Sequence, residues 1–361
     1  MPVKRLAPSR FTAFVACPLR EVFRTSSAPR LLASVGAAHL GTVIHELLER
    51  AAKVEKLSAT EAETLFGDLL RKEEETMLLS ATARTAVPLA TSVRDFEVRK
   101  RRAIHAAGLS AGRRQARTET GAGGLRAGTE VWVQSADGTI GGYVDEVAIR
   151  DGAVVIRDFK SGAASRRTSE HFAGALQQVQ MYAALYADMT GTWPSVVEIV
   201  PVDGEPIAAA VDRDECESML RQAKELLAQC NDTLALAPAS DAALQLARPA
   251  PETCRRCEYR PLCAAYDAAR QADDQWPRDV TGTIMRRENL RNGTVLFTVG
   301  GRSGVASVRG VKDDNTRHEA LPLLVVGSIA GFYNLTGGRN GSSYTESALT
   351  SVVAFAVSDK G

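Results

Sequence analysis

The chain has 361 residues, which is enough for more than one domain. Hydrophobic residues make up 45% of it and charged residues 24%, as in soluble globular proteins, and no apolar run approaches the ~20 residues of a membrane-spanning helix. The net charge of +1 argues against a strongly basic surface over the whole molecule, although local basic clusters could still bind phosphate. The basic first residues precede no apolar stretch, so we expect no secretory signal and a cytoplasmic location.

Helices are predicted along the first third of the chain. A stripe of apolar residues predicts one helix over residues 6–25, which contains Cys17, and another over residues 36–56, which contains His45. Taken alone, Cys17 would be a buried apolar residue in most proteins, and a single histidine on a helix is more often structural than a ligand. Residues 58–110 are predicted to be helical throughout.

A basic run closes this helical region. Residues 99–102 read RKRR, and further arginines follow at positions 113, 114 and 117. Such a run can contact a DNA backbone or form a solvated helix face, and the sequence leaves both interpretations open.

Strands dominate the next stretch. Residues 127–135 predict one strand, and residues 141–160 predict a pair joined by Asp151-Gly152, a hairpin turn signal. The following elements are predicted as a helix at 170–189, a strand at 195–203, a segment at 206–212 that could pair with it, and a helix at 213–235.

The hairpin at 141–160 carries acidic residues in unusual places. Asp145 and Asp158 lie at the edges of hydrophobic strand segments, where aspartate is depleted. Two carboxylates on adjacent strands repel each other unless a cation lies between them, and hard oxygen ligands suit Mg²⁺ or Mn²⁺. Lys160 projects from the same strand face as Asp158, where an ammonium group could orient a water or stabilise charge on a phosphate. The alternative is an ordinary surface hairpin with turn aspartates.

The helix at 170–189 presents Gln178 and Tyr182 on one face, since they are four residues apart. An amide and a hydroxyl can hold a phosphate or a water without adding negative charge. Alternatively, Tyr182 packs in the core and Gln178 is solvated. Gln177 and Gln180 leave the register of the helix open.

Three of the six cysteines cluster as C-x2-C-x5-C at Cys254, Cys257 and Cys263, and Cys17 is the candidate for a fourth ligand. Zinc normally completes paired C-x-x-C knuckles or recruits histidine. All-thiolate ligation is also the coordination of iron–sulfur clusters, so both metals remain to be weighed.

The last part of the chain, from about Trp276, alternates β-branched residues with Asn-Gly, Gly-Gly and Ser-Gly turns. This pattern predicts a small β-barrel, with an OB-like fold as one option, that could bind single strands by stacking bases on aromatic rings over a basic groove. Alternatively, the barrel packs against the rest of the chain or against a protein partner. The candidate residues are Phe297, Phe332 and Tyr333, with Arg286, Arg287, Arg302 and Arg309.

The segments GYVDEV, DFKSG and QQVQMY, in this order, resemble the RecB-type branch of the PD-(D/E)XK nuclease superfamily. In this resemblance Asp145 is the first acid, and Asp158-Phe159-Lys160 is the D-x-K element. A lone D-x-K is common by chance, but the ordered set is far more specific. The resemblance implies an α/β core with a central mixed sheet flanked by helices over residues 1–270. It does not extend to the barrel predicted at 276–361.

The resemblance also implies roles for individual residues. It assigns an Mg²⁺ or Mn²⁺ site to Asp145, Asp158, His45, the backbone carbonyl of Phe159 and, more loosely, Glu130. It assigns the activation or positioning of water and strand to Lys160, Gln178 and Tyr182. Independently of the resemblance, candidates for DNA contacts are Arg166 and Arg167, which follow the loop after Lys160, and Arg286 and Arg287 in the predicted barrel. The layout of Cys17 with the three later cysteines resembles the [4Fe-4S] staple of AddB-like and CRISPR-adaptation-exonuclease-like nucleases, which favours iron–sulfur over zinc.

The expected activity is metal-dependent hydrolysis of DNA, and by resemblance an exonuclease acting on single-stranded ends in repair, recombination or phage defence. No G-x-x-x-x-G-K-[ST] motif is present, so the chain is not itself a helicase, but a helicase or a defence-system protein is a candidate partner. The alternative is a catalytically silent iron–sulfur DNA-binding or scaffold subunit. The intact set of Asp145, Asp158 and Lys160 argues against it.

Overall fold

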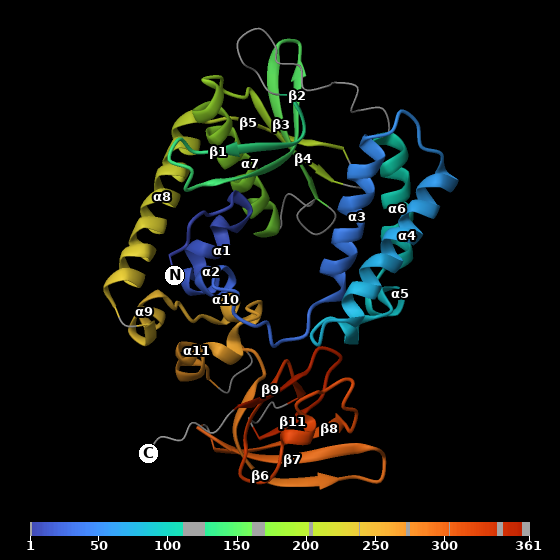
Figure 1. Cartoon of the computed structure of the whole chain (residues 1–361), viewed down its shortest axis with the longest axis vertical. Coiled ribbons are helices and arrows are strands. Elements are labelled where there is room, and N and C mark those ends of the chain that lie inside the picture. Colours follow the sequence, from blue (N-terminus) through green and yellow to red (C-terminus); the bar gives the residue numbers. More distant parts are fainter. Residues whose placement is uncertain are drawn as a thin grey trace. The chain divides into compact units, whose positions relative to one another are not determined.

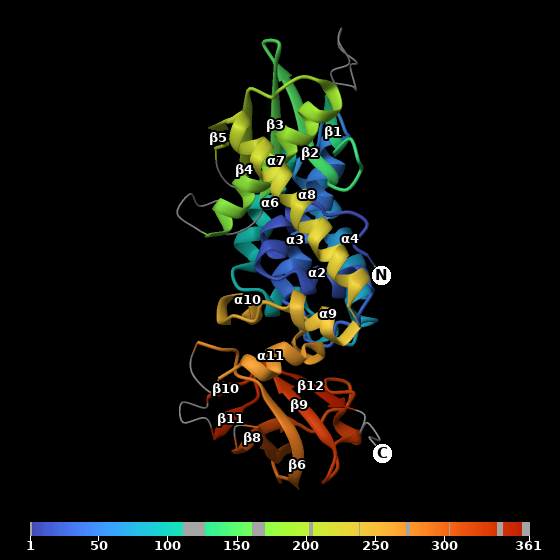
Figure 2. The same ribbon diagram turned by 90° about the vertical axis from the view of Figure 1, so that its left-hand side faces the viewer.

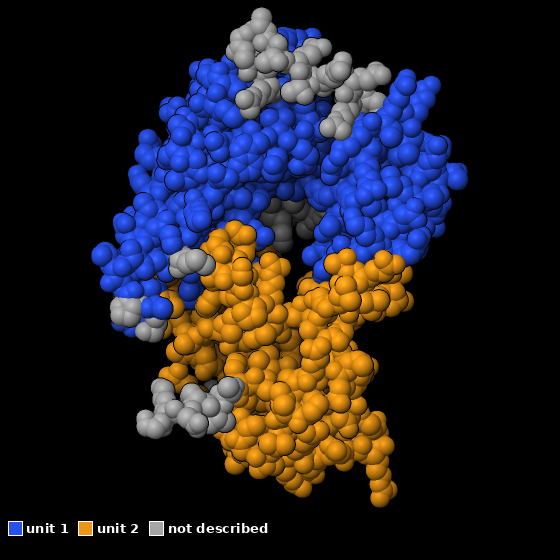
Figure 3. Space-filling model, in the orientation of Figure 1, with its two compact units in different colours: residues 1–22, 37–73, 93–242 blue, residues 23–36, 74–92, 243–361 orange. Residues whose placement is uncertain are grey.

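A computed structural model describes residues 2–110, 127–160, 170–201, 205–237, 239–271, 275–302, 304–337 and 342–355. The chain forms two compact units, which Figure 3 shows in different colours. Unit 1 comprises Met1–Val22, Ala37–Glu73 and Val93–Ala242. Unit 2 comprises Phe23–Gly36, Glu74–Ser92 and Ala243–Gly361. No helix of the described residues is both long enough and apolar enough to cross a membrane.

The centre of unit 1 is a five-stranded sheet (Figure 1) made of β1 (Gly128–Gln134), β2 (Gly141–Arg150), β3 (Ala153–Lys160), β4 (Val196–Pro201) and β5 (Ile207–Ala210). The strands follow each other in sequence order across the sheet. All neighbours are antiparallel except β3 and β4, which are parallel. Parallel neighbours need a crossover. Helix α7 (Glu170–Thr190) lies between them in the chain and packs against the sheet.

The predicted hairpin at 141–160 is confirmed. Asp151 and Gly152 both have positive φ values, 50° and 78°, as a two-residue turn between twisted strands requires. The strand predictions at 127–135, 195–203 and 206–212 and the helix predictions at 170–189 and 213–235 are also confirmed to within a few residues.

The remaining helices with their bounds are α1 (Phe11–Ala16), α2 (Pro18–Thr25), α3 (Gly36–Ala52), α4 (Ala59–Leu78), α5 (Leu89–Ser92), α6 (Phe96–Ser110), α8 (Arg213–Leu236), α9 (Ala239–Leu246), α10 (Pro251–Arg255) and α11 (Ala264–Ala269). Two predictions of continuous helix were wrong. The helix predicted at 6–25 is broken at Cys17, which is extended (φ −161°, ψ 99°) because the following proline disfavours helical backbone before it. The helix predicted at 58–110 is interrupted between Leu78 and Phe96, a stretch that contains Pro88.

Helices α3, α4 and α6 pack together in unit 1 (Figures 1 and 2). The rings of Phe66 on α4 and Phe96 on α6 lie 6.2 Å apart. Lys100, from the predicted basic run, lies 2.8 Å from Glu63, so this lysine joins two helices. The arginines at 113, 114 and 117 lie outside the described residues.

Unit 2 contains a seven-stranded sheet whose strands are β6 (Val280–Asn289), β7 (Thr294–Gly301), β8 (Gly304–Lys312), β9 (Ile329–Tyr333), β10 (Thr336–Gly337), β11 (Ser343–Thr345) and β12 (Ser351–Phe355). Their order is β10-β11-β8-β7-β6-β9-β12, with β10 and β12 at the edges. The described strands therefore form an open, curled sheet rather than the closed barrel that we predicted. Local alternation identifies strands, but closure depends on which distant strands pair, and alternation does not record that.

Candidate active site

The neighbouring strands β2 and β3 bring the two predicted acids together. Glu146 of β2 is opposite Arg157 of β3, so Asp145 and Asp158 occupy the next positions along the two antiparallel strands. Oδ2 of Asp145 accepts a hydrogen bond from the backbone N–H of Phe159 at 2.7 Å. This bond ties the first acid directly to the D-x-K segment.

Asp158, Lys160 and Gln178 form a closed set of contacts. Nε2 of Gln178 donates to Oδ1 of Asp158 at 2.7 Å, and Nζ of Lys160 donates to Oε1 of Gln178 at 3.0 Å. Nζ of Lys160 also lies 2.6 Å from Oδ2 of Asp158, as an ion pair. A residue of α7 thus holds both ends of the D-x-K element in place.

The structure identifies which glutamine of α7 faces this set. The neighbouring Gln177 lies at the surface, where its Oε1 accepts a hydrogen bond from Thr12 at 3.0 Å. Gln180 points toward Glu215, 3.5 Å away. Of these three glutamines, Gln178 is the one that hydrogen-bonds to the D-x-K element among the described residues.

Burial controls the charge of the two acids. The pKa of both Asp145 and Asp158 is raised to about 6, mainly by burial, and the negative charge of Asp145 contributes to the rise at Asp158. The ammonium group of Lys160 acts in the opposite direction on both. Among the described residues, Oδ2 of Asp158 is buried with the ion pair to Lys160, at 2.6 Å, as its polar contact. A cation bound beside this carboxyl would add to the compensation of its charge.

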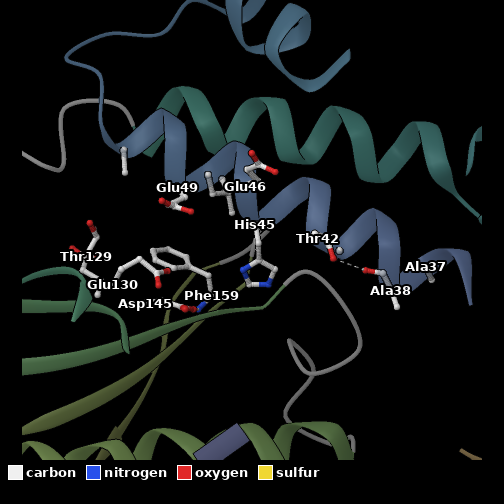
Figure 4. A pocket seen from close by; sticks show the side chains of 14 residues that line it. Ala37, Ala38, Thr42, His45, Glu46, Glu49, Thr129, Glu130, Asp145 and Phe159 are labelled. Atoms are coloured by element: carbon white, nitrogen blue, oxygen red, sulfur yellow. Dashed lines mark hydrogen bonds between the residues drawn. The ribbon is translucent and has the colours of Figure 1, made fainter. Parts of the chain in front are cut away.

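Helix α3 faces the strands across a cavity of about 660 Å³ (Figure 4). His45 projects from α3 toward the strands that carry Asp145 and Phe159. Burial lowers the pKa of His45, Lys160 lowers it further, and Asp158 opposes them. The imidazole is therefore neutral at neutral pH, the form in which histidine binds metals.

Glu130 of β1 lines the same cavity, together with Glu49 of α3 (Figure 4). Burial raises the pKa of Glu130, the charge of Glu49 raises it further, and Lys53 opposes them. Glu130 in turn raises the pKa of Asp145, which places its charge close to the first acid. Its backbone has a positive φ of 52°, which interrupts the regular strand at this position.

Tyr182 lies beneath the site rather than at its surface. It is 3% exposed, and a side chain at Gly142 would meet its hydroxyl oxygen at 3.3 Å. Burial, followed by the charge of Asp158, raises the pKa of Tyr182, whereas a hydrogen bond with Gln178 lowers it. Tyr182 thus packs between α7 and β2 and touches the site through Gln178.

A family model of the PD-(D/E)XK nuclease superfamily matches residues 5–264 of this chain. That span contains both acids, the lysine, the glutamine and the histidine described above. The chain belongs to the PD-(D/E)XK nuclease superfamily. No curated protein matches the chain.

Among solved structures, the chain is similar to one titled "Crystal structure of SSO0001", with 17% sequence identity and a TM-score of 0.24. The match covers 39% of this chain and 61% of that one. A TM-score this low does not establish a common fold.

Superfamily membership implies a divalent metal, and the donor set described here fits one. The buried carboxyl of Asp158 and the half-buried carboxyl of Asp145, both with raised pKa values, lie near the neutral imidazole of His45. Such oxygen ligands suit Mg²⁺ or Mn²⁺. Within the described ranges, however, no three His, Cys, Asp or Glu side chains already form a group that could hold a metal ion.

The three clustered cysteines of this PD-(D/E)XK protein lie in unit 2. Cys254 belongs to α10, and Cys263 precedes α11, where its Sγ accepts a hydrogen bond from the backbone N–H of Tyr266 at 3.3 Å. Among the described residues, neither these thiols nor Cys17 of unit 1 belong to a group of three or more side chains that could hold a metal ion. The iron–sulfur cluster therefore stays a prediction.

The base-stacking residues predicted in the C-terminal sheet are buried. Phe297 and Phe332 are 0% exposed, with ring centroids 5.1 Å apart, and Tyr333 is also buried. These rings fill the core of unit 2, so they offer no surface to a base. Alternation along a strand does not reveal which face an adjoining element covers, and the prediction of a stacking surface was wrong for this reason.

The predicted arginine contacts divide into three cases. Arg287 donates to the carbonyl oxygens of Leu321 and Leu324 and lies over the ring of Phe297, so it is engaged within unit 2. Arg286 is exposed and pairs with Glu288. The remaining two, Arg166 and Arg167, lie outside the described residues.

Proposed function

We propose that this protein is a metal-dependent deoxyribonuclease that trims single-stranded DNA ends. The observation that carries the proposal is the closed contact set of Asp158, Lys160 and Gln178 beside Asp145 and an open cavity. Superfamily membership suggests phosphodiester hydrolysis, and the order of the motifs supports the finer assignment.

In this proposal, different residues bind the metal ion and orient the attacking water. Asp145 and Asp158, with His45 and the carbonyl of Phe159, would hold Mg²⁺ or Mn²⁺, and Glu130 would add charge nearby. When bound, such an ion supplies charge stabilisation at the phosphate and lowers the pKa of a water. Lys160 is held in place by Gln178, and its ammonium group is available to orient the attacking water or to stabilise the developing negative charge.

The finer parts of the proposal rest on the resemblance of motifs. They are exonucleolytic action, a [4Fe-4S] cluster on Cys17, Cys254, Cys257 and Cys263, a nuclease domain ending near residue 270, and a helicase or defence-system partner. The one-plus-three spacing of the cysteines supports the cluster. An iron and sulfide assay after anaerobic purification tests it independently of any nuclease activity.

The activity is tested with end-labelled single-stranded and double-stranded DNA, with and without Mn²⁺. We expect Lys160→Ala to abolish cleavage and Gln178→Ala to lower the rate by roughly 10²-fold or more, because Gln178 positions both reactive groups. Gln177→Ala is the matched control, since its side chain lies on the same helix but outside the site. Wild-type rates in the Lys160→Ala variant would rule out the site. Folded wild-type protein that binds DNA but does not cleave it would point to the silent scaffold.

A further inference from the structure

An aromatic pair with one exposed ring lies on the sheet of unit 1. Trp132 of β1 and Tyr143 of β2 are opposite each other in the antiparallel pair, with ring centroids 4.8 Å apart at 66°. Tyr143 is 57% exposed. Arg5 places its guanidinium 5.0 Å from the Trp132 ring centroid, and its Nε donates to the carbonyl of Gly138 at 2.9 Å. We call these three residues the aromatic platform.

The rings of Trp132 and Tyr143 lie on the face of β1 and β2 that is opposite α7. The neighbouring Gly142 faces α7, because a Cβ placed there would contact Tyr182. Side chains of consecutive strand residues point to opposite faces. Tyr143 therefore faces away from α7.

The platform is also continuous with the catalytic residues. Tyr143 precedes Asp145 by two residues, which corresponds to ~7 Å along a strand. On β1, Trp132 follows Thr129 and Glu130, both of which line the cavity. A chain of nucleotides with one phosphate at Asp145 would thus bring a neighbouring base to Tyr143.

We propose that the aromatic platform stacks an unpaired base next to the scissile phosphate and so selects single-stranded DNA. The inference deepens the proposed function and rests on it. The exposed ring of Tyr143 offers an aromatic surface to a base, and Arg5 adds a positive charge next to the Trp132 ring. In a duplex both faces of each internal base are already stacked, so the platform discriminates by strandedness rather than by sequence.

Binding without metal tests the platform, because cleavage is then excluded. Fluorescence anisotropy would compare the affinity of the full chain for a single-stranded oligonucleotide and for an oligonucleotide of the same length with abasic sites. We expect Tyr143→Ala to weaken binding of the normal strand roughly tenfold to hundredfold, the loss of one stacked base, and to leave binding of the abasic strand unchanged. Tyr143→Phe retains the ring and should restore the affinity.

Ile149→Ala is the matched control, since Ile149 is a 37% exposed residue near the other end of the same strand. Equal weakening for normal and abasic strands, or no weakening in Tyr143→Ala, would overturn the platform. A parallel cleavage assay of the wild type with Mn²⁺ separates the two proposals. Absent cleavage would refute the proposed function, whereas the contrast between normal and abasic strands decides the platform by itself.

Discussion

At the scale of single residues, burial determines how the site responds to pH. The folded-state pKa of about 6 for Asp145 and Asp158 exceeds the ~4 of an unfolded aspartate. These groups therefore favour the folded state at low pH, and that contribution is lost as the pH rises through about 6. At neutral pH both carboxyls of the metal-free protein are ionised although burial disfavours their charge. A bound cation would offset this unfavourable free energy and so stabilise the folded state.

We therefore expect Mn²⁺ to raise the melting temperature of the wild type more at about pH 7.5 than at about pH 5. Asp158→Asn removes one buried charge, so it should raise the melting temperature of the metal-free protein at the higher pH and reduce the Mn²⁺ effect. Differential scanning fluorimetry at both pH values measures these shifts. A Mn²⁺ effect that is equal at the two pH values, or unchanged in the variant, would count against the proposed metal site.

Asp137, on the turn before β2, provides a control because its pKa is lowered, whereas the pKa values of Asp145 and Asp158 are raised. Burial alone would raise its pKa, but hydrogen bonds from Ser135 and Thr139 outweigh that effect and lower the pKa. Its contribution to stability is present at neutral pH and is lost as the pH falls. Asp137→Asn should therefore lower the melting temperature at about pH 7.5 and leave the Mn²⁺ effect unchanged.

At the scale of elements, the sequence predicts contacts well where a short turn joins the two strands concerned. Asp145 and Asp158 meet because a two-residue turn joins their strands, and Asp151-Gly152 marks that turn in the sequence. The side of α7 that carries Gln178 was less certain, since it depends on the rotation of the helix on the sheet. The aromatic platform escaped prediction because it depends on the register that pairs Trp132 with Tyr143.

The element that carries the clustered cysteines is held by a buried arginine. Arg260 is 3% exposed and donates to the carbonyl oxygens of Cys254 at 3.0 Å and Cys257 at 3.1 Å. Its Nε lies 2.8 Å from Oδ2 of Asp279, which also accepts a hydrogen bond from the hydroxyl of Tyr266. The shape of the cysteine loop therefore depends on one buried ion pair.

Arg260→Met should lower the free energy of unfolding of unit 2 by about 3–5 kcal/mol, because it leaves the carboxylate of Asp279 buried without its charge partner. Urea unfolding followed by circular dichroism measures the change. Arg317→Met is the comparison, since Arg317 pairs with Glu346 in the same unit but is more exposed, and we expect a smaller loss. An equal loss of unfolding free energy in Arg317→Met would show that the deeper burial of the Arg260 ion pair does not increase its contribution to stability.

At the scale of the whole molecule, the cysteine loop and the C-terminal sheet belong to the same compact unit. Unit 2 contains the chain from Ala243 onward, on both sides of the nuclease-domain boundary predicted near residue 270. Asp279, the partner of Arg260, lies just before β6. Asn334, after β9, accepts a second hydrogen bond from the same guanidinium. The cysteine loop and the C-terminal sheet are thus parts of one hydrogen-bonded network within unit 2.

A chain ending at residue 270 would lose Asp279 and Asn334 and leave Arg260 without either partner. We expect its cysteine loop to open, so that Cys254, which is 7% exposed in the full chain, reacts with a thiol reagent at a much higher rate. Pulse labelling followed by peptide mass spectrometry measures that rate, and Cys216 of α8 in unit 1 serves as an internal control. If Cys254 were protected equally in both chains, the C-terminal sheet would have no part in holding the loop. If Cys254 alone becomes reactive, the sheet stabilises the cysteine loop, whether or not any of its arginines contacts DNA.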